Sequence, residues 1–377
     1  MKVFLLVLLS LSHGVAGDVY FGTWGGAAAD GIYRARFDRS SGQLRQVERA
    51  AAILSPGFLA WHPTLEILYA VGTLDGVEGV AAFLRQGDGR LRLLHHLALH
   101  EKGACHLAVH PSGSFLMTAQ YGEGTTAVFS LRSDGGLGEK VASLPHRPRD
   151  PQQPLNRSGP HPHWTGFSPD GRFALVPDLG LDEVFVYAVL DEPPFLRFHG
   201  RSSLRTGSGP RHLRFSVDGR FVFVLNELAL TCTTFAYQAQ QGILSRRSTV
   251  AALSESDKAK EDFVTASEIV VHPNGRWVYS ANRGHDSVTV YAVDPASGEL
   301  EVIEVEPIRG AWPRNVNLDP SGKWLLAAGA HSRTLSVFRV DPETGQLQFP
   351  RRGSYAAPPI GCILFAKEPS SEGGEEE

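Results

Sequence analysis

The chain has 377 residues, of which 42% are hydrophobic and 20% are charged, and its formal net charge is −4. This composition is typical of a soluble globular protein and excludes collagen-like, disordered and multi-span membrane chains. The chain has no basic excess and no run of Lys and Arg interleaved with aromatic residues, so nucleic acid is not an expected partner.

The first 17 residues, MKVFLLVLLSLSHGVAG, have the pattern of an export signal. Lys2 precedes an apolar run, Val3–Leu11, and small residues follow at Val15–Gly17. The run is too short to anchor the chain in a bilayer, and the alternative, a buried first strand, explains neither the lysine nor the small residues. We expect residues 1–17 to be removed and the mature protein, beginning near Asp18, to be a periplasmic or secreted monomer without a membrane anchor.

A recurring sequence motif dominates the rest of the chain. An apolar run ends in His, Ser or Asp, a Pro-x-Gly turn or a variant of it follows, and a second apolar run begins. We call this turn the marker turn and a repeat that contains it a marked repeat. The motif occurs as WHPTLEILYAV, VHPSGSFLMTA, FSPDGRFALVP, FSVDGRFVFVL, VHPNGRWVYSA and LDPSGKWLLAA. Its copies lie roughly 47 to 58 residues apart, which is about the length of a β-propeller blade.

Each repeat contains four short strands, as the fifth marked copy illustrates. We expect strands at Glu268–Val271, Trp277–Ala281, Ser287–Val293 and Leu300–Val305, separated by Gly-containing turns. These runs are too short and too often interrupted by Gly and Pro for helices. The pattern therefore predicts an all-β protein built from four-stranded antiparallel blades.

Six marked repeats and an N-terminal unit give seven blades. The N-terminal unit lacks a marker turn, and we expect its missing innermost strand to come from Ile360–Ala366, which joins the two ends of the chain and removes exposed edges. The propeller then covers residues 18–367. Two irregular stretches, Leu144–Pro160 and Ala252–Asp262, are predicted surface loops, and residues 368–377 a disordered acidic tail.

Three cysteines, Cys105, Cys232 and Cys362, lie in apolar strand-like runs. An odd number excludes a complete disulfide framework, and the simplest interpretation is that each is a small buried side chain. The chain has no CxxC, HExxH, GxSxG, P-loop or dinucleotide motif. A serine nucleophile and a zinc-protease site are therefore not expected, and no cofactor is predicted.

Polar residues recur where the innermost strands begin and where the following strands end. Equivalent positions of successive blades converge on the central channel of a propeller, although they are far apart in the sequence. The polar residues at these positions include His163, Arg211, His212, Glu227, Glu268, Asn282, Arg283, Arg314 and Asn315. By contrast, His62, His110 and His272 each precede a turn proline, and this repetition indicates a structural role.

The channel residues suit acyl chemistry on a small anion. Arginines can hold a carboxylate or polarise a carbonyl, and a neighbouring Glu or His can activate water. The alternative is that Arg and Glu merely pair across the channel. We favour a binding or catalytic site because the positive and hydrogen-bonding groups outnumber what two glutamates can pair.

The repeats resemble the lactonase family of seven-bladed β-propellers, which includes 6-phosphogluconolactonase and the fungal carboxy-muconate lactonizing enzyme. The matching segments are GPHPHWTGFSPDGRFALVPDLGLDEVFVY, GPRHLRFSVDGRFVFVLNEL, SEIVVHPNGRWVYSANRGHDSVTVY and PRNVNLDPSGKWLL. The resemblance implies a metal-free active site lined by His163, Arg211, Glu227 and Arg283, with His161, His212, Glu268 and Arg314 nearby.

By this resemblance the protein is a lactone hydrolase acting on a sugar or small organic lactone. The arginines would stabilise the oxyanion, and Glu227 or His163 would direct water. Two alternatives stay open: a lactonizing cycloisomerase, and a non-catalytic propeller that binds sugars or protein partners.

The export signal gives the first testable prediction. N-terminal sequencing of protein purified from its native host should begin near Asp18, because the small residues before it suit signal peptidase. A sequence that begins at Met1 would contradict export by this signal.

Overall fold

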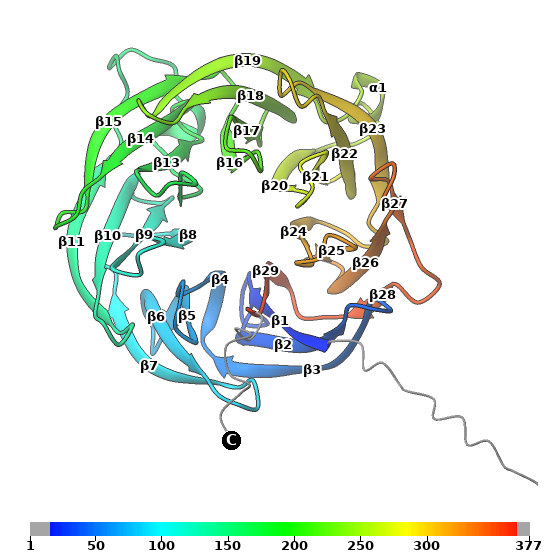
Figure 1. Cartoon of the computed structure of the whole chain (residues 1–377), viewed down its shortest axis with the longest axis horizontal. Coiled ribbons are helices and arrows are strands. Elements are labelled where there is room, and N and C mark those ends of the chain that lie inside the picture. Colours follow the sequence, from blue (N-terminus) through cyan, green and yellow to red (C-terminus); the bar gives the residue numbers. More distant parts are fainter. Residues whose placement is uncertain (1–15, 368–377) are drawn as a thin grey trace, which may run out of the picture.

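A computed structural model of the chain describes residues 16–367, which form seven antiparallel sheets around a central channel (Figure 1). From the channel outwards, blade 1 contains β29 (Ile360–Phe365), β1 (Ala16–Thr23), β2 (Gly31–Asp38) and β3 (Gln43–Ala52); blade 2 contains β4 (Leu54–Trp61), β5 (Ile67–Leu74), β6 (Val77–Arg85) and β7 (Leu91–Ala98); blade 3 contains β8 (Ala104–Val109), β9 (Phe115–Gln120), β10 (Thr125–Leu131) and β11 (Leu137–Pro145).

The remaining blades continue around the ring in chain order. Blade 4 contains β12 (Gly166–Phe167), β13 (Phe173–Asp178), β14 (Glu183–Val189) and β15 (Leu196–Ser203); blade 5 contains β16 (Pro210–Phe215), β17 (Phe221–Asn226), β18 (Thr231–Gln238) and β19 (Ile243–Ala251). Blade 6 contains β20 (Thr265–Val271), β21 (Trp277–Arg283), β22 (Ser287–Val293) and β23 (Leu300–Pro307); blade 7 contains β24 (Pro313–Leu318), β25 (Trp324–Gly329), β26 (Thr334–Val340) and an outer edge divided between β27 (Leu347–Gln348) and β28 (Ser354–Ala356).

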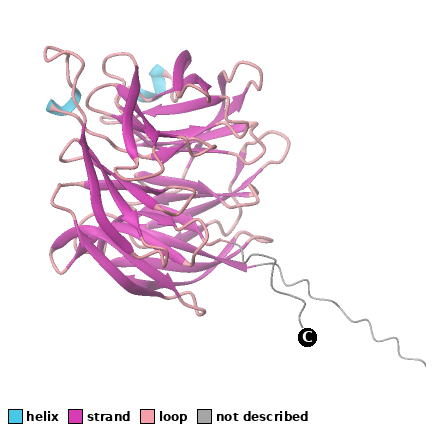
Figure 2. Ribbon diagram, turned by 60° about the vertical axis from the view of Figure 1, so that its left-hand side comes forward, coloured by secondary structure: helices cyan, strands magenta, loops and turns pink. Residues whose placement is uncertain are grey.

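The predicted seven-bladed, all-β architecture is confirmed. In blade 6 the strand Ser287–Val293 has the expected bounds, and the other three extend a few residues further than expected. Helical structure is limited, within the described residues, to the 3-10 turn η1 (Asn156–Ser158) and the single turn α1 (Glu255–Lys258), both in the predicted loops (Figure 2).

The C-terminal strand closes the ring as predicted. β29 pairs with β1 in antiparallel register, from Val19 opposite Phe365 to Thr23 opposite Ile360. The first blade is thus completed by residues from both ends of the propeller, and the inner edge of β1 is hydrogen-bonded to β29 rather than left unpaired.

The hydrophobic core lies between the blades. Within residues 16–367, seven apolar clusters each fill the gap between two neighbouring blades. Phe21 of β1, for example, packs with Trp324 and Val337 of blade 7. Because each sheet is covered on both faces, its middle strands are almost continuously buried.

The marker turns connect each blade to the next. The ring nitrogen Nε2 of His110 lies 3.0 Å from the carbonyl oxygen of Gly171, and that of His272 lies 2.9 Å from the carbonyl oxygen of Gly322. Both glycines have a positive φ, near 72° and 73°, which turns of this type require and which most side chains disfavour. These histidines therefore have the structural role that their repetition suggested.

A β-bulge interrupts the innermost strand at the channel positions. In blade 5, Pro210 pairs with Asn226 and His212 with Leu225, so Arg211 is the extra residue. Blades 3 and 7 show the same shift at Cys105 and Arg314. A regular strand would send neighbouring side chains to opposite faces, whereas a bulge turns both toward the channel.

Parts of the predicted terminal segments lie outside the described residues. The tail 368–377 is entirely outside them, as are residues 1–15 of the proposed signal, while Ala16 and Gly17 begin β1. Among residues 16–367, the structure contains no helix long and apolar enough to cross a membrane.

Gly22 of β1 provides a test of the packing between blades 1 and 2. A Cβ atom on Gly22 would lie 2.3 Å from the carbonyl oxygen of Pro56 in the next blade. Gly22→Ala should therefore lower the free energy of unfolding by about 1–3 kcal/mol, as overpacking does. Urea denaturation would measure it.

Gly87→Ala is the matched control, because a Cβ there meets nothing within 4 Å and the backbone is not left-handed. We expect a change within about 0.5 kcal/mol. Equal free energies of unfolding for the two variants would contradict close packing between blades 1 and 2.

Candidate functional site

One mouth of the channel opens into a cavity of about 440 Å³. Three arginines contribute to its wall, together with carboxylate, imidazole, thiol and aromatic side chains. The lining side chains with chemical function are Trp24, Glu78, Cys105, Tyr121, Arg157, His163, Glu227, Arg283 and Arg314. They come from all seven blades and the connections between them, so the cavity exists only in the closed ring.

Glu227, which follows β17, binds three guanidinium groups. Its Oε2 lies 2.8 Å from Nε of Arg211 and 3.1 Å from Nη2 of Arg283. Its Oε1 lies 3.3 Å from Nη2 of Arg157. Burial raises the pKa of Glu227, but the guanidinium groups of Arg283, Arg211 and Arg157 lower it by more, so that the net pKa lies below the usual value. Glu227 is therefore a carboxylate at neutral pH.

Backbone carbonyl groups also hold Arg211 and Arg283 in place. Arg211 donates from Nη1 to the carbonyl oxygen of Ser267, and Arg283 donates from Nη2 to that of Ala266 at 2.8 Å. Burial lowers the pKa of Arg283 to about 10, although Glu227 opposes the shift. Both side chains are held by a carboxylate and a carbonyl, which makes them rigid.

Arg314 is different, because among the described residues it forms no ion pair. Its guanidinium lies 3.7 Å from the centre of the ring of Trp24, a residue of the neighbouring blade 1. Burial lowers the pKa of Arg314 well below its ordinary value, and the like charges of Arg211 and Arg283 lower it further. A positive charge in this position is relieved by an anion in the cavity.

His163 lines the cavity as a neutral imidazole. Burial, followed by the charges of Arg211 and other neighbours, lowers its pKa well below 6.5. Its Nδ1 lies 3.9 Å from Sγ of Cys105, whose pKa burial raises to about 12. Within the described residues no carboxylate forms an ion pair with the ring, and a neutral imidazole has one nitrogen lone pair that can accept a proton.

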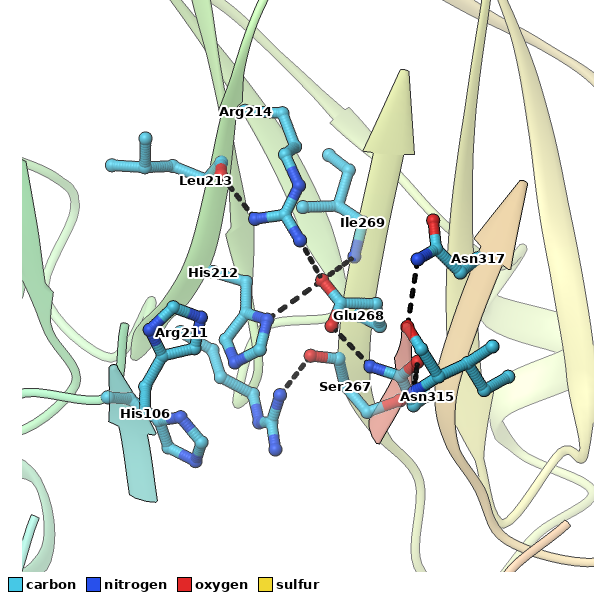
Figure 3. Close-up of polar contacts among 12 residues, drawn as sticks. His106, Arg211, His212, Leu213, Arg214, Ser267, Glu268, Ile269, Asn315 and Asn317 are labelled. Carbon is cyan, nitrogen blue, oxygen red and sulfur yellow. Dashed lines mark hydrogen bonds and ion pairs between the residues drawn. The ribbon is translucent and has the colours of Figure 1, made fainter. Parts of the chain in front are cut away.

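Glu268 binds a second polar cluster deeper in the channel (Figure 3). Its Oε1 accepts from Nδ1 of His212 at 2.8 Å and from Nη2 of Arg214 at 3.0 Å, and its Oε2 accepts from Nδ2 of Asn315 at 2.7 Å. Asn315 in turn accepts from the backbone amide of Ile363 in β29 at 3.0 Å. Glu268 and Asn315 thus tie blades 5, 6 and 7 to the closing strand.

Aromatic and imidazole rings fill the channel at this depth. His212 lies with its ring centre 5.3 Å from that of His163 and 5.5 Å from that of His106. His106 lies against Phe58, with ring centres 3.8 Å apart. An apolar hollow on the other side includes Phe58, His106 and Trp164 in its wall. The ring layer therefore separates the polar cavity from the opposite, apolar mouth.

Two predicted binding residues point elsewhere. Asn282 donates from Nδ2 to Ser287 at 3.0 Å and to Thr289 at 2.8 Å within its own blade, and Asn226 makes the equivalent contacts in blade 5. His161 binds the backbone carbonyls of Tyr121 at 2.7 Å and Arg157 at 2.9 Å. Neither Asn282 nor His161 lines the cavity.

The structure thus brings His163, Glu227, Arg283 and Arg314 to the cavity, Arg211 directly behind it, and His212, Glu268 and Asn315 to the layer beneath. The sequence prediction missed Arg157. The stretch Leu144–Pro160 was expected to be a surface loop, but it reaches the cavity through Arg157 and buries His146 against Asp178. Its polar, proline-rich composition showed no periodicity that could reveal either contact.

Metal ligation is not indicated by the structure: within residues 16–367, no group of three or more His, Cys, Asp or Glu side chains is arranged to hold a metal ion.

Comparisons with known proteins find relatives along almost the whole chain. Residues 18–365 match the family model described as "Lactonase, 7-bladed beta-propeller". The chain is 32% identical over 301 residues to the 6-phosphogluconolactonase of Bacillus subtilis (strain 168), which covers 80% of this chain and 84% of that protein.

Two solved structures extend the similarity. The Pseudomonas aeruginosa periplasmic gluconolactonase PpgL has a TM-score of 0.85 and 29% identity, covering 94% of this chain and 100% of its own. A putative 6-phosphogluconolactonase from Bacteroides uniformis has a TM-score of 0.84 and 28% identity, covering 93% and 99%.

The buried histidines predict how stability depends on pH. Burial lowers the pKa of His106, His163 and His212 well below 6.5, so below that pH the unfolded chain binds protons that the folded chain does not. The contribution of these neutral histidines to the free energy of unfolding is fully present above about pH 6.5. At lower pH the free energy of unfolding should decrease by up to about 1.4 kcal/mol per pH unit for each histidine. Urea titrations between about pH 7.5 and 5.5 would measure the slope.

His106→Phe is a useful comparison, because His106 packs against Phe58 and its Nε2 has no partner among the described residues. The variant should show a shallower slope than the parent. A stability that does not change over this pH range would contradict neutral burial of the three rings.

Proposed function

The chain belongs to the lactonase family of seven-bladed β-propellers, and we propose that it is a lactone hydrolase that opens a sugar or other small organic lactone in the channel cavity. The observation that supports this most directly is the cavity itself, whose wall contains both the guanidinium of Arg314, which forms no ion pair among the described residues, and the neutral imidazole of His163. Two of the relatives, at 32% and 29% identity, are named as lactonases.

Lactone opening requires two kinds of assistance. The oxygen of a water molecule attacks the carbonyl carbon while losing a proton, and negative charge develops on the carbonyl oxygen. The ring C–O bond then breaks, and the departing oxygen takes a proton. Preorganised positive groups stabilise the oxyanion, and a nearby base accepts the proton from water.

Arg283 and Arg314 are the groups that we assign to the oxyanion. Both line the cavity, and Arg314 forms no ion pair within the described residues. Arg211 lies behind them, bound to Glu227 and to the carbonyl of Ser267. Its contribution is to hold Glu227, and therefore Arg283, in a fixed position. Guanidinium groups that do not reorganise during the reaction are the effective ones.

His163 is the group that we assign to the proton. Both oxygens of Glu227 are occupied by guanidinium groups, whereas His163 retains an available lone pair. The same imidazole can later return the proton to the ring oxygen that departs. Because its pKa is lowered, His163 stays neutral and able to act as a base below the usual histidine range.

We also propose that the enzyme acts outside the cytoplasm. The N-terminal sequence has the pattern of an export signal, and one structural neighbour is described as a periplasmic gluconolactonase. An exported enzyme meets lactones of the cell envelope or the surroundings.

The proposal predicts acid release from lactones. In a pH-stat, purified protein should hydrolyse at least one member of a panel of sugar, muconate-type and simple lactones. His163→Asn should lower kcat by about a hundredfold or more, as loss of a general base does. The acid limb of kcat/KM should lie below about pH 6.5, since protonation of His163 removes the base.

His110→Asn is the matched control, because His110 lies in a marker turn against Gly171 and away from the cavity; its turnover should be that of the parent. Glu227→Gln should keep the acid limb while losing rate through disordered arginines. An acid limb that disappears in Glu227→Gln and persists in His163→Asn would assign the proton to Glu227 instead. If no lactone is hydrolysed, the non-catalytic binding propeller becomes the better interpretation.

A further inference from the structure

Arg157 is the exposed member of the three arginines on Glu227. Its side chain is 46% exposed, compared with 3% for Arg211 and 7% for Arg283. It also comes from the connection before blade 4 rather than from a repeated strand position. The contact with Glu227 is the longest of the three, at 3.3 Å. Arg157 therefore meets solvent at the mouth of the cavity while touching the charged cluster inside it.

The backbone around Arg157 is firmly held. Asn156 donates from Nδ2 to the carbonyl of Leu179 and to Asp182, at 2.8 and 2.9 Å, and its amide donates to the carbonyl of Gly180 at 2.8 Å. Arg157 itself has a left-handed backbone, with φ 52° and ψ 35°. Non-glycine residues adopt this conformation at a cost, which the surrounding bonds offset here.

A glycine permits this close approach of the loop. A Cβ atom on Gly180 would lie 1.7 Å from the carbonyl oxygen of Gly159, two residues after Arg157. The loop thus holds the backbone of Arg157 at the mouth, where its long side chain is half-exposed.

We propose that Arg157 is a specificity-determining residue that exchanges Glu227 for an anionic substituent, a phosphate or carboxylate, carried by the substrate away from its lactone carbonyl. The inference rests on the proposed function, because it names the substrate class of the same cavity.

The energetics favour exchange at this arginine and not at the other two. Arg157 is half-exposed, so its ion pair with Glu227 contributes less than a fully buried pair, and Glu227 keeps Arg211 and Arg283 as partners when Arg157 turns to another anion. Separating the buried partners Arg211 and Arg283 from Glu227 would leave uncompensated charge inside the protein. A guanidinium also binds phosphate or carboxylate in a bidentate fork, which lysine cannot reproduce.

The charge of the cavity favours an incoming anion. Arg157, Arg283 and Arg314 line it, and Glu78 and Glu227 are the carboxylates of its wall within the described residues. Arg211 adds a further positive charge behind Glu227. Two relatives are named as a 6-phosphogluconolactonase and a gluconolactonase, and the substrates in these names differ by one phosphate group. An arginine at the position of Arg157 could distinguish such substrates.

Three product-like ligands test the exchange without requiring turnover. Gluconate, 6-phosphogluconate and glucarate share a carbon skeleton and differ at the sixth carbon, which carries a hydroxyl, a phosphate or a carboxylate. Calorimetry should show that the protein binds at least one of the two substituted ligands more tightly than gluconate. Arg157→Ala should abolish that preference, an effect of about ten- to a hundredfold, and weaken gluconate binding by much less. Arg157→Lys should recover only part of it.

Arg147→Ala is the control from the same connection, because Arg147 is exposed and its side chain makes no ion pair within the described residues. It should bind all three ligands like the parent. With a hydrolysed lactone, Arg157→Ala should raise KM for the anionic substrate by a larger factor than it lowers kcat.

A parent protein without preference among the three ligands would overturn the inference. So would an Arg157→Ala variant that weakens gluconate as much as the substituted ligands, because Arg157 would then act only through Glu227. Failure of the proposed function is a separate result: no lactone is hydrolysed, whatever the calorimetry shows.

Discussion

The pairing of β29 with β1 is the constraint on which the channel depends. Seven blades form one ring only if the last strand completes the first blade, and that pairing brings both ends of the propeller together. The closed ring places Trp24 of blade 1 against Arg314 of blade 7, and Asn315 against the backbone of Ile363 in β29. An open array would leave these groups apart, and the cavity would lack part of its wall.

Within the closed ring, two glutamates at different depths organise the charges. Glu268 lies deeper and satisfies His212, Arg214 and Asn315, which makes it part of the framework. Glu227 lies at the cavity and binds Arg211, Arg283 and Arg157. A single carboxylate cannot neutralise so many guanidiniums in a poorly solvated space. The residual positive charge favours an anion in the cavity and supports the oxyanion role that we propose for Arg283 and Arg314.

The site combines a rigid part with an adaptable part. The repeated blades supply Arg211, Arg283 and Arg314 from strands whose faces are packed on both sides. A connection of irregular sequence supplies Arg157, whose side chain remains exposed. The sequence of this connection can change without disturbing the strands that hold the other three arginines.

The sequence by itself determined the number of blades, the closing strand and the strand ends that carry His163, Arg211, Glu227 and Arg283, because a repeat places equivalent positions at equivalent points of a ring. It also identified the turn histidines as structural. It did not reveal that bulges turn both residues of a pair such as Arg211 and His212 toward the channel, or that Asn282 turns into its own blade. Nor did it reveal Arg157, since an irregular loop has no period to align. Only the tertiary structure decided these points, because bulges, side-chain directions and loop paths depend on contacts between residues that are distant in the sequence.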